Sequence, residues 1–202
     1  MRPRRILVAL LAVLAVLSGG TAVGVTALSV RVEGASMAPT LRDGERLLAT
    51  PGSADDVRRF DLVLMHRPRT DVLIVKRVIA LPGDRVGIVS TPRDPFEVLL
   101  RKAGDDRLHR VASDAWGDRA RRTGNCCGAD GTRSAAPRLR TVPPGRFFFL
   151  GDNPDVSDDS RHYGWGRLED VAGRVGARVW PPSAPHGLGN RPRLTRVPGD
   201  GP

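Results

Sequence analysis

The run Val72-Leu-Ile-Val-Lys-Arg-Val-Ile-Ala-Leu81 decides the fold of this chain. Its β-branched and apolar side chains favour a strand, and a bounded run of this length is typical of a strand buried in a sheet. Similar short runs, separated by turn residues, recur before and after it, which predicts an all-β domain with mainly antiparallel strands. The expected strands are residues 29–33, 45–49, 61–65, 72–81, 85–89, 96–100, 138–142, 146–150 and 171–180.

The composition narrows the classes of protein that the chain can represent. The 202 residues include 23 Gly and 17 Pro, a proportion that favours turns over a helical bundle. The net charge of +10 is modest and spread along the sequence, so it argues only weakly for nucleic acid, and we expect no nucleic-acid partner. The cysteines are Cys126 and Cys127, which excludes a scaffold of several disulfides. This adjacent pair is either incidental or oxidised to a disulfide between neighbours.

The first residues predict a membrane anchor. Residues 1–5 are basic, and residues 6–28 carry no charge and are long enough to cross a bilayer as one helix. Basic residues before the span hold the N-terminus in the cytoplasm and place the rest of the chain outside. The alternative is a secretory signal that is cleaved off. We expect residues 29–180 to form the β domain, residues 101–137 a variable insertion within it, and residues 181–202 a disordered tail rich in Pro, Gly and Arg.

Lysine usage singles out one residue for chemistry. The chain has 32 basic residues, of which only Lys76 and Lys102 are lysines. Lysine, unlike arginine, can lose its proton near neutral pH when its surroundings are apolar. Lys76 lies within the apolar run 72–81 and is therefore a candidate base. The alternative is a lysine at the edge of a strand with its amine in water.

Two other segments carry groups that could act with this lysine. Ser36 lies in Gly34-Ala-Ser-Met-Ala-Pro-Thr-Leu41, a turn after the first expected strand, but the spacings typical of α/β-hydrolases and β-lactamases are absent there. Residues 147–164 run from an apolar strand into a loop with Ser157, Asp159 and Arg161 at alternate positions, on one side of an extended chain. That loop could instead be a solvated acidic turn or, although it lacks the required Gly and Glu, a calcium loop. A histidine-based triad is a further alternative.

These three segments, in this order behind an N-terminal span, resemble the type I signal peptidases, a family of membrane-bound Ser–Lys proteases. Residues 34–41 match the box that carries the family's nucleophile, residues 76–84 the box of its general base, and residues 151–164 its C-terminal box. The resemblance implies a signal-peptidase-like β domain preceded by one transmembrane helix. The chain departs from the family at Gly34, where some members have a hydroxyl that helps to hold the oxyanion.

Carried over residue by residue, the resemblance assigns a role to each matching position. Ser36 would be the nucleophile and Lys76 its general base, with the Ser157 hydroxyl orienting the amine. Asp159 and Arg161 would form a supporting ion pair, and Asp152 would shape the same loop. The resemblance further implies a substrate cleft formed by Val30, Val32, Gly34, Met37, Leu41, Ile74 and Val75.

The implied function is removal of signal peptides from exported preproteins, by cleavage after small residues at positions −1 and −3. Such an enzyme needs no cofactor and no metal. Its partners would be preproteins and membrane lipid, and its location the cell membrane, with the catalytic domain outside the cytoplasm. Two alternatives remain open: a maturation protease of the same family with one or few substrates, and a single-pass membrane protein that binds partners without catalysis. A repressor-type Ser–Lys autoprotease would need a DNA-binding domain where this chain has its uncharged span.

Overall fold

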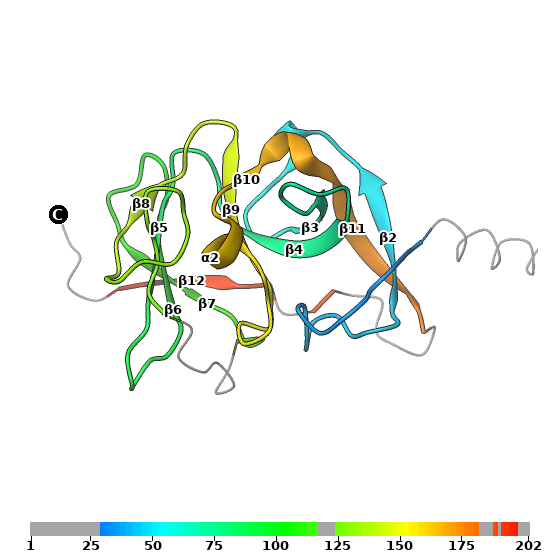
Figure 1. The fold of residues 1–202 in the computed structure, drawn as a ribbon, viewed down its shortest axis with the longest axis horizontal. Helices are drawn as coiled ribbons and strands as arrows, with labels where there is room; N and C mark the ends of the chain where they lie inside the picture. The colour runs from blue at the N-terminus through cyan, green and yellow to red at the C-terminus, as the bar shows by residue number, and fades with distance from the viewer. Residues whose placement is uncertain (1–28, 117–123, 182–187, 190, 198–202) are drawn as a thin grey trace, which may run out of the picture.

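The computed structural model describes residues 29–116, 124–181, 188–189 and 191–197. These residues form two antiparallel β-sheets, with the five-stranded sheet on the left of Figure 1 and the seven-stranded sheet on the right. The predicted antiparallel β fold is thus confirmed. The seven-stranded sheet has the order β1-β2-β11-β3-β4-β9-β10, and the five-stranded sheet has the order β12-β7-β6-β5-β8. The strands are β1 Val30–Arg31, β2 Arg46–Pro51, β3 Leu62–His66, β4 Leu73–Ala80, β5 Arg85–Val89, β6 Glu97–Arg101, β7 His109–Ala112, β8 Arg140–Thr141, β9 Arg146–Leu150, β10 Gly166–Arg167, β11 Val171–Trp180 and β12 Arg193–Arg196.

Strand β9 lies between two hydrophobic clusters, because successive side chains of a strand point to opposite faces. Phe147 and Phe149 pack into a cluster with Val63 and Val78 of the seven-stranded sheet. Phe148 and Leu150 point the other way, into a cluster built mostly by the five-stranded sheet. These four side chains of β9 are fully buried. The strand therefore joins the two halves of the domain and fixes where the loop after it begins.

Helices in the described residues are short. The α-helix α2, Ser160–Tyr163, follows β9 and begins at Asp159, whose side chain accepts a hydrogen bond from the backbone N–H of Arg161. The 3₁₀-helices are Ala54–Asp56 and Leu168–Asp170. Ser53 and Asp56 form a capping box on the first of them.

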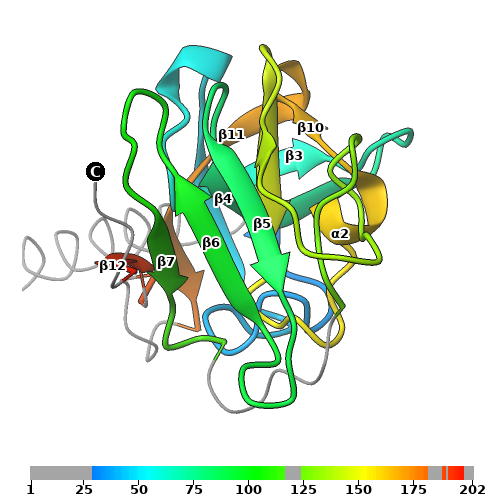
Figure 2. The same ribbon diagram turned by 90° about the vertical axis from the view of Figure 1, so that its left-hand side faces the viewer.

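Strands β7, β10 and β12 lie in segments that the sequence does not mark as strands. Strand β7 falls within residues 101–137, and strand β12 falls within residues 181–202, the predicted disordered tail. Figure 2 shows β12 beside β7, and the two pair antiparallel along their whole lengths. The prediction is therefore corrected for residues 193–196: β12 gains its order by pairing with an edge strand, which its own composition does not reveal.

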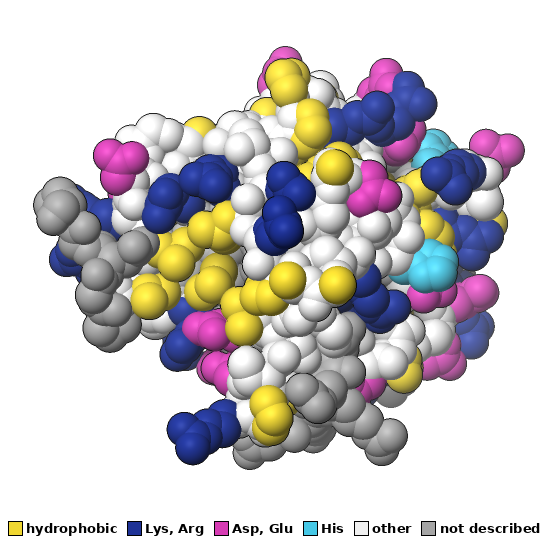
Figure 3. All heavy atoms as spheres, turned by 60° about the vertical axis from the view of Figure 1, so that its left-hand side comes forward, with side chains coloured by type: hydrophobic (Ala, Val, Ile, Leu, Met, Phe, Trp, Pro, Cys, Tyr) yellow, Lys and Arg dark blue, Asp and Glu magenta, His cyan; other side chains and the backbone are white. Residues whose placement is uncertain are grey.

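The predicted anchor, residues 6–28, lies outside the described residues. No helix among the residues that the structure describes is long and apolar enough to cross a membrane. Figure 3 shows Lys and Arg side chains at separate places on the face turned toward the viewer, with apolar side chains gathered between some of them. On this face, the positive charge of the chain is spread out, as its sequence suggests.

Candidate active site

Ser36 lies in the turn after β1, and the loop after β9 holds that turn in place. The backbone N–H of Asn153 donates to the carbonyl oxygen of Ser36 at 3.0 Å. The side-chain amide of Asn153 donates to the carbonyl oxygen of Ala35 at 3.2 Å. The turn begins at Gly34, whose φ of +83° suits glycine and whose N–H donates to Asp43 at 2.8 Å. The side chain of Ser36 is half-buried.

Lys76 lies near the middle of β4, opposite Val63 of β3. Only 3% of its surface is exposed, and its Nζ lies 3.2 Å from Oγ of Ser157, with which it forms a hydrogen bond. Burial lowers the pKa of Lys76 below the ordinary value of 10.5, against the opposing attraction of nearby carboxylates, Asp159 first among them. A lysine in this setting is shifted toward the neutral amine that a general base requires.

Gly151, at the end of β9, brings the turn of Ser36 and the amine of Lys76 to one place. A Cβ added to Gly151 would lie 2.2 Å from Oγ of Ser157 and 2.4 Å from the carbonyl oxygen of Ser36. Both oxygen atoms therefore crowd the same point on the backbone. Since Ser157 also holds Nζ of Lys76, the three segments singled out in the sequence converge here.

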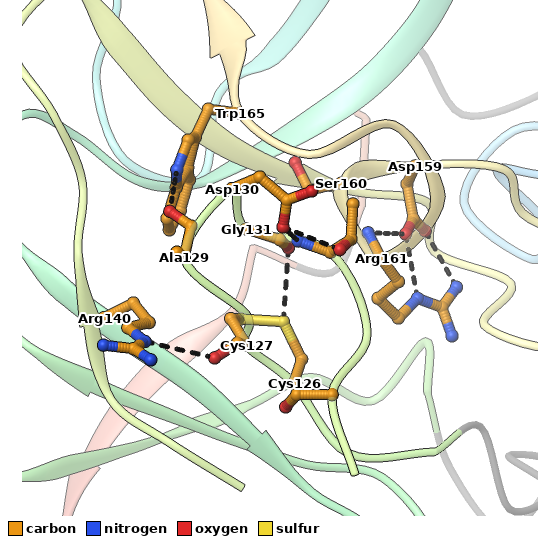
Figure 4. Close-up of a disulfide and its surroundings, with 12 residues drawn as sticks. Cys126, Cys127, Ala129, Asp130, Gly131, Arg140, Asp159, Ser160, Arg161 and Trp165 are labelled. Carbon is orange, nitrogen blue, oxygen red and sulfur yellow. Dashed lines mark hydrogen bonds and ion pairs between the residues drawn. A yellow bond between two sulfur atoms is a disulfide. The ribbon is translucent and has the colours of Figure 1, made fainter. Parts of the chain in front are cut away.

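Two buried ion pairs surround this point. Asp159 binds the guanidinium of Arg161 through both carboxylate oxygens, each at 2.8 Å, as Figure 4 shows. Asp159 also accepts the backbone N–H of Gly151 at 3.1 Å, and Arg161 donates to the carbonyl oxygen of Ser157 at 3.3 Å. This pair therefore fixes the backbone on both sides of the loop that carries Ser157.

The second ion pair joins Arg77, the residue after Lys76, to Asp152. Arg77 binds both carboxylate oxygens of Asp152, at 2.7 and 2.6 Å, and the hydroxyl of Thr40 also donates to this carboxylate. Asp152 thus ties β4 and the Ser36 turn to the loop after β9. The sequence pointed to Asp152 but missed Arg77 and Thr40. Side chains alternate along a strand, so Lys76 and Arg77 are expected on opposite faces of β4. The sequence therefore does not indicate that both bind residues of the loop after β9, Lys76 to Ser157 and Arg77 to Asp152.

A pocket of about 210 Å³ opens beside Ser36. Most of the residues predicted for the substrate cleft line it, but two do not. Leu41 is fully buried in the cluster that contains Val32 and Met37, so it supports the pocket from within the core. Gly34 has open space where a Cβ would be, and it is absent from the lining. The pocket is lined by Val30, Arg31, Val32, Glu33, Ser36, Met37, Leu64, Leu73, Ile74 and Val75, of which Arg31, Glu33, Leu64 and Leu73 were not predicted.

The remaining polar groups of interest lie elsewhere. Lys102, the other lysine, forms an exposed ion pair with Asp105 at 3.2 Å. Cys126 and Cys127 form a disulfide with each other and are fully buried. Within the described residues, no group of three or more His, Cys, Asp or Glu side chains is placed to hold a metal ion.

Comparisons with known proteins give the family. The family model described as signal peptidase, peptidase S26, matches residues 4–180. Signal peptidase I of Bacillus caldolyticus is 37% identical over 152 residues, which cover 74% of this chain and 78% of that protein. Signal peptidase I of Streptococcus pneumoniae serotype 4 is 33% identical over 178 residues, covering 76% of this chain and 82% of the relative. A crystal structure of a signal peptidase I from Enterococcus faecalis V583 is similar with a TM-score of 0.45 and 24% identity, over 60% of this chain and 97% of that one.

The family model covers most of the chain, and relatives more than 30% identical cover about three quarters of it. The chain therefore belongs to the S26 signal peptidases, serine endopeptidases that remove signal peptides from exported preproteins.

Proposed function

We propose that this signal peptidase cleaves its substrates with a Ser–Lys dyad, in which Ser36 is the nucleophile and Lys76 the general base. The observation that carries the proposal is the buried amine of Lys76, hydrogen-bonded to the Ser157 hydroxyl beside the Ser36 turn. A neutral amine in this position can accept the proton of a serine hydroxyl, which an ammonium group cannot do. Ser157 is the orienting group, in the place that histidine's partner takes in a triad.

The proton moves twice through Lys76. The amine takes the proton from Ser36 Oγ as that oxygen attacks the scissile carbonyl, and the resulting ammonium gives it to the leaving amine. Water then attacks the acyl-enzyme while Lys76 accepts its proton, and Lys76 returns that proton to Oγ of Ser36 as the ester bond breaks, which restores the neutral amine and the serine hydroxyl. We expect the backbone N–H of Ser36 to stabilise the oxyanion, because Gly34 has no side-chain hydroxyl that could do so. One such donor contributes about 3–4 kcal/mol to the transition state.

The substrate would bind as an extended strand beside the pocket. Strand β1 is an edge of the seven-stranded sheet, and β9 pairs with β4 only from Arg77 onward. The part of β4 before Lys76 therefore leaves its edge open to a peptide. A pocket of about 210 Å³, lined by apolar side chains together with Arg31, Glu33 and Ser36, fits small side chains at positions −1 and −3, as the resemblance implies.

The location follows from the sequence before residue 29. We propose that residues 6–28 anchor the enzyme in the cell membrane, with residues 1–5 in the cytoplasm and residues 29–180 outside it. An anchored enzyme meets membrane lipid and substrates held at the same surface. Sequencing the N-terminus of the mature protein tests the anchor: the intact Met1 end is expected, and a start near Val25 or Leu28 would show a cleaved signal instead.

The test of the dyad is cleavage of a panel of exported preproteins by the full-length enzyme in detergent or vesicles. We expect Ser36→Ala and Lys76→Ala to lose activity by several orders of magnitude, since neither proton transfer nor attack remains. Lys102→Ala is the matched control, because it removes the other lysine from an exposed ion pair, and it should cleave like the wild type. Full activity of either dyad variant would refute the mechanism, and cleavage of a single precursor would point to a dedicated maturation protease.

A further inference from the structure

The Cys126–Cys127 disulfide packs in the same hydrophobic cluster as the end of β9, where the loop that carries Ser157 begins. Both cysteines are fully buried in the cluster that also contains Phe148 and Leu150 of β9. Cys126 exchanges two backbone hydrogen bonds with Ile88 of β5, at 2.9 and 3.0 Å. The pair is therefore fixed to the five-stranded sheet, and the chain leaves it toward α2.

The residues that follow form what we call the disulfide turn, residues 126–133. The disulfide sulfur of Cys126 lies 3.4 Å from the carbonyl oxygen of Gly131, and the N–H of Gly128 donates to the carbonyl oxygen of Thr132 at 2.8 Å. The side chain of Asp130 accepts hydrogen bonds from both the hydroxyl and the backbone N–H of Thr132. The turn is thus closed on itself and held at one end by the disulfide.

The disulfide turn contacts α2 and the residue after it through the backbone. The N–H of Arg133 donates to the carbonyl oxygen of Arg161 at 3.0 Å, and the N–H of Trp165 donates to the carbonyl oxygen of Asp130 at 3.0 Å. The indole N–H of Trp165 donates to Ala129 at 3.2 Å, as Figure 4 shows.

The contact between the disulfide turn and residues 164–165 leaves no room for an added side-chain atom. A Cβ on Gly131 would lie 2.7 Å from the ring of Trp165, and one on Gly164 would lie 2.5 Å from the carbonyl oxygen of Asp130. A shift of the disulfide turn must therefore move α2 with it, because interiors packed this tightly transmit displacement.

From α2 the contacts continue to the amine of the proposed dyad. Arg161 binds Asp159 and the carbonyl oxygen of Ser157, whose hydroxyl holds Nζ of Lys76. We propose that the Cys126–Cys127 disulfide is a positioning element of the active site, which holds the disulfide turn against α2 and thereby fixes Ser157 on Lys76. This inference rests on the proposed role of Lys76 as the base.

A disulfide between adjacent residues has little effect on the unfolded chain. In the chain-entropy account, the stabilisation by a disulfide increases with the length of the loop that it closes, and the separation here is one residue. Its main effect is therefore on local position. That distinction gives the test: loss of the disulfide should change how Lys76 titrates more than it changes the stability of the fold.

The direction of that change follows from the groups around Lys76. Burial lowers its pKa, the charges of Asp159, Asp158 and Asp152 raise it, and the charge of Arg161 lowers it. A looser α2 admits water to the amine and weakens the Asp159–Arg161 pair, and both changes raise the pKa. Since the neutral amine is the active form, kcat/KM at a pH below the pKa of Lys76 should fall about tenfold for each unit by which that pKa rises.

The experiment compares pH profiles of full-length enzymes on one preprotein. Mass spectrometry of the wild type, unreduced, is expected to find the peptide with Cys126 and Cys127 two hydrogens lighter than the dithiol. The variant Cys126→Ala/Cys127→Ala should lose at least tenfold in kcat/KM on the acid limb of the profile and recover at alkaline pH. Gly131→Ala, which keeps both cysteines but pushes the turn from Trp165, should show the same shift of the acid limb.

Val111→Ala is the matched control, since it truncates another buried side chain of the same cluster. It should lower the melting temperature without moving the acid limb. A free dithiol in the wild type, or acid limbs of both turn variants that coincide with that of the wild type, would overturn the inference while leaving the dyad intact. The dyad itself fails on a different result, activity of Ser36→Ala or Lys76→Ala, so the two failures are distinguishable.

Discussion

Replacing Gly151 by alanine should disable the enzyme without unfolding it. The added Cβ would lie 2.2 Å from Oγ of Ser157 and 2.4 Å from the carbonyl oxygen of Ser36, whereas contacts under 3.0 Å are essentially never seen for real Cβ atoms. At least one of these oxygen atoms must therefore move by roughly 1 Å, and a misplacement of about 1 Å in an active site can reduce the rate about 10²-fold. That loss corresponds to about 2.7 kcal/mol of transition-state stabilisation.

The assay for Gly151→Ala is single-turnover cleavage of a preprotein, with thermal unfolding measured on the same preparation. We expect the rate of the chemical step to fall about 10²-fold while KM changes little, because the apolar side chains that line the pocket are unchanged. The matched control is Gly176→Ala in β11, where the new Cβ would meet only the carbonyl oxygen of Leu48 at 3.9 Å. A rate for Gly151→Ala within threefold of the wild type would refute the convergence of the three segments on this glycine.

Three further predictions concern the charges of the site. The wild-type kcat/KM should rise with pH through an apparent pKa below 10.5, because burial lowers the pKa of Lys76 and the neutral amine is active; a pH–rate profile with no acid limb would contradict this. Lys76→Met should raise the melting temperature at pH 7, and the gain should vanish above pH 10.5. The sign follows because the unfolded chain binds the proton of Lys76 more readily than the folded one, so the wild type loses stability as pH falls below the unfolded pKa. Scanning calorimetry of both proteins at several pH values measures the gain, and a gain independent of pH would contradict the prediction. Arg77→Leu should reduce the free energy of unfolding by about 3–5 kcal/mol, since it leaves Asp152 as an unpaired buried carboxylate; urea titration measures the loss, and an unchanged midpoint would show that the pair contributes nothing.

The strands that could be predicted from the sequence are those whose side chains carry a pattern of their own. The bounds expected for residues 85–89, 146–150 and 171–180 coincide with β5, β9 and β11. Strands β10 and β12 are short and polar, and each owes its strand conformation to a partner elsewhere in the chain: β10 to β9, and β12 to β7. Pairing between distant segments leaves no local signal, so composition alone misassigned residues 193–196.

In the candidate site too, some residues are marked by their own sequence and others only by contacts with distant segments. Ser36, Lys76 and Ser157 stand out in the sequence because each is a reactive residue in an unusual setting. Gly151 does not, because its importance lies in two oxygen atoms from other segments that crowd it. Arg77 was missed for a related reason, since an arginine in a chain rich in arginine attracts notice only when its partner, Asp152, is placed beside it.

The two ion pairs have a common consequence for Lys76. Buried salt bridges contribute little net stability, because removing two charges from water costs about as much as their attraction returns. Here each of the buried carboxylates nearest the amine is already bound by an arginine, Asp159 by Arg161 and Asp152 by Arg77, and the third, Asp158, is exposed to solvent. The arginines therefore prevent either buried carboxylate from pairing with Lys76, which would hold the lysine in its charged form. The two ion pairs therefore help to keep Lys76 neutral. Carboxylates that shape the loop can lie beside a base only if another cation neutralises their charge.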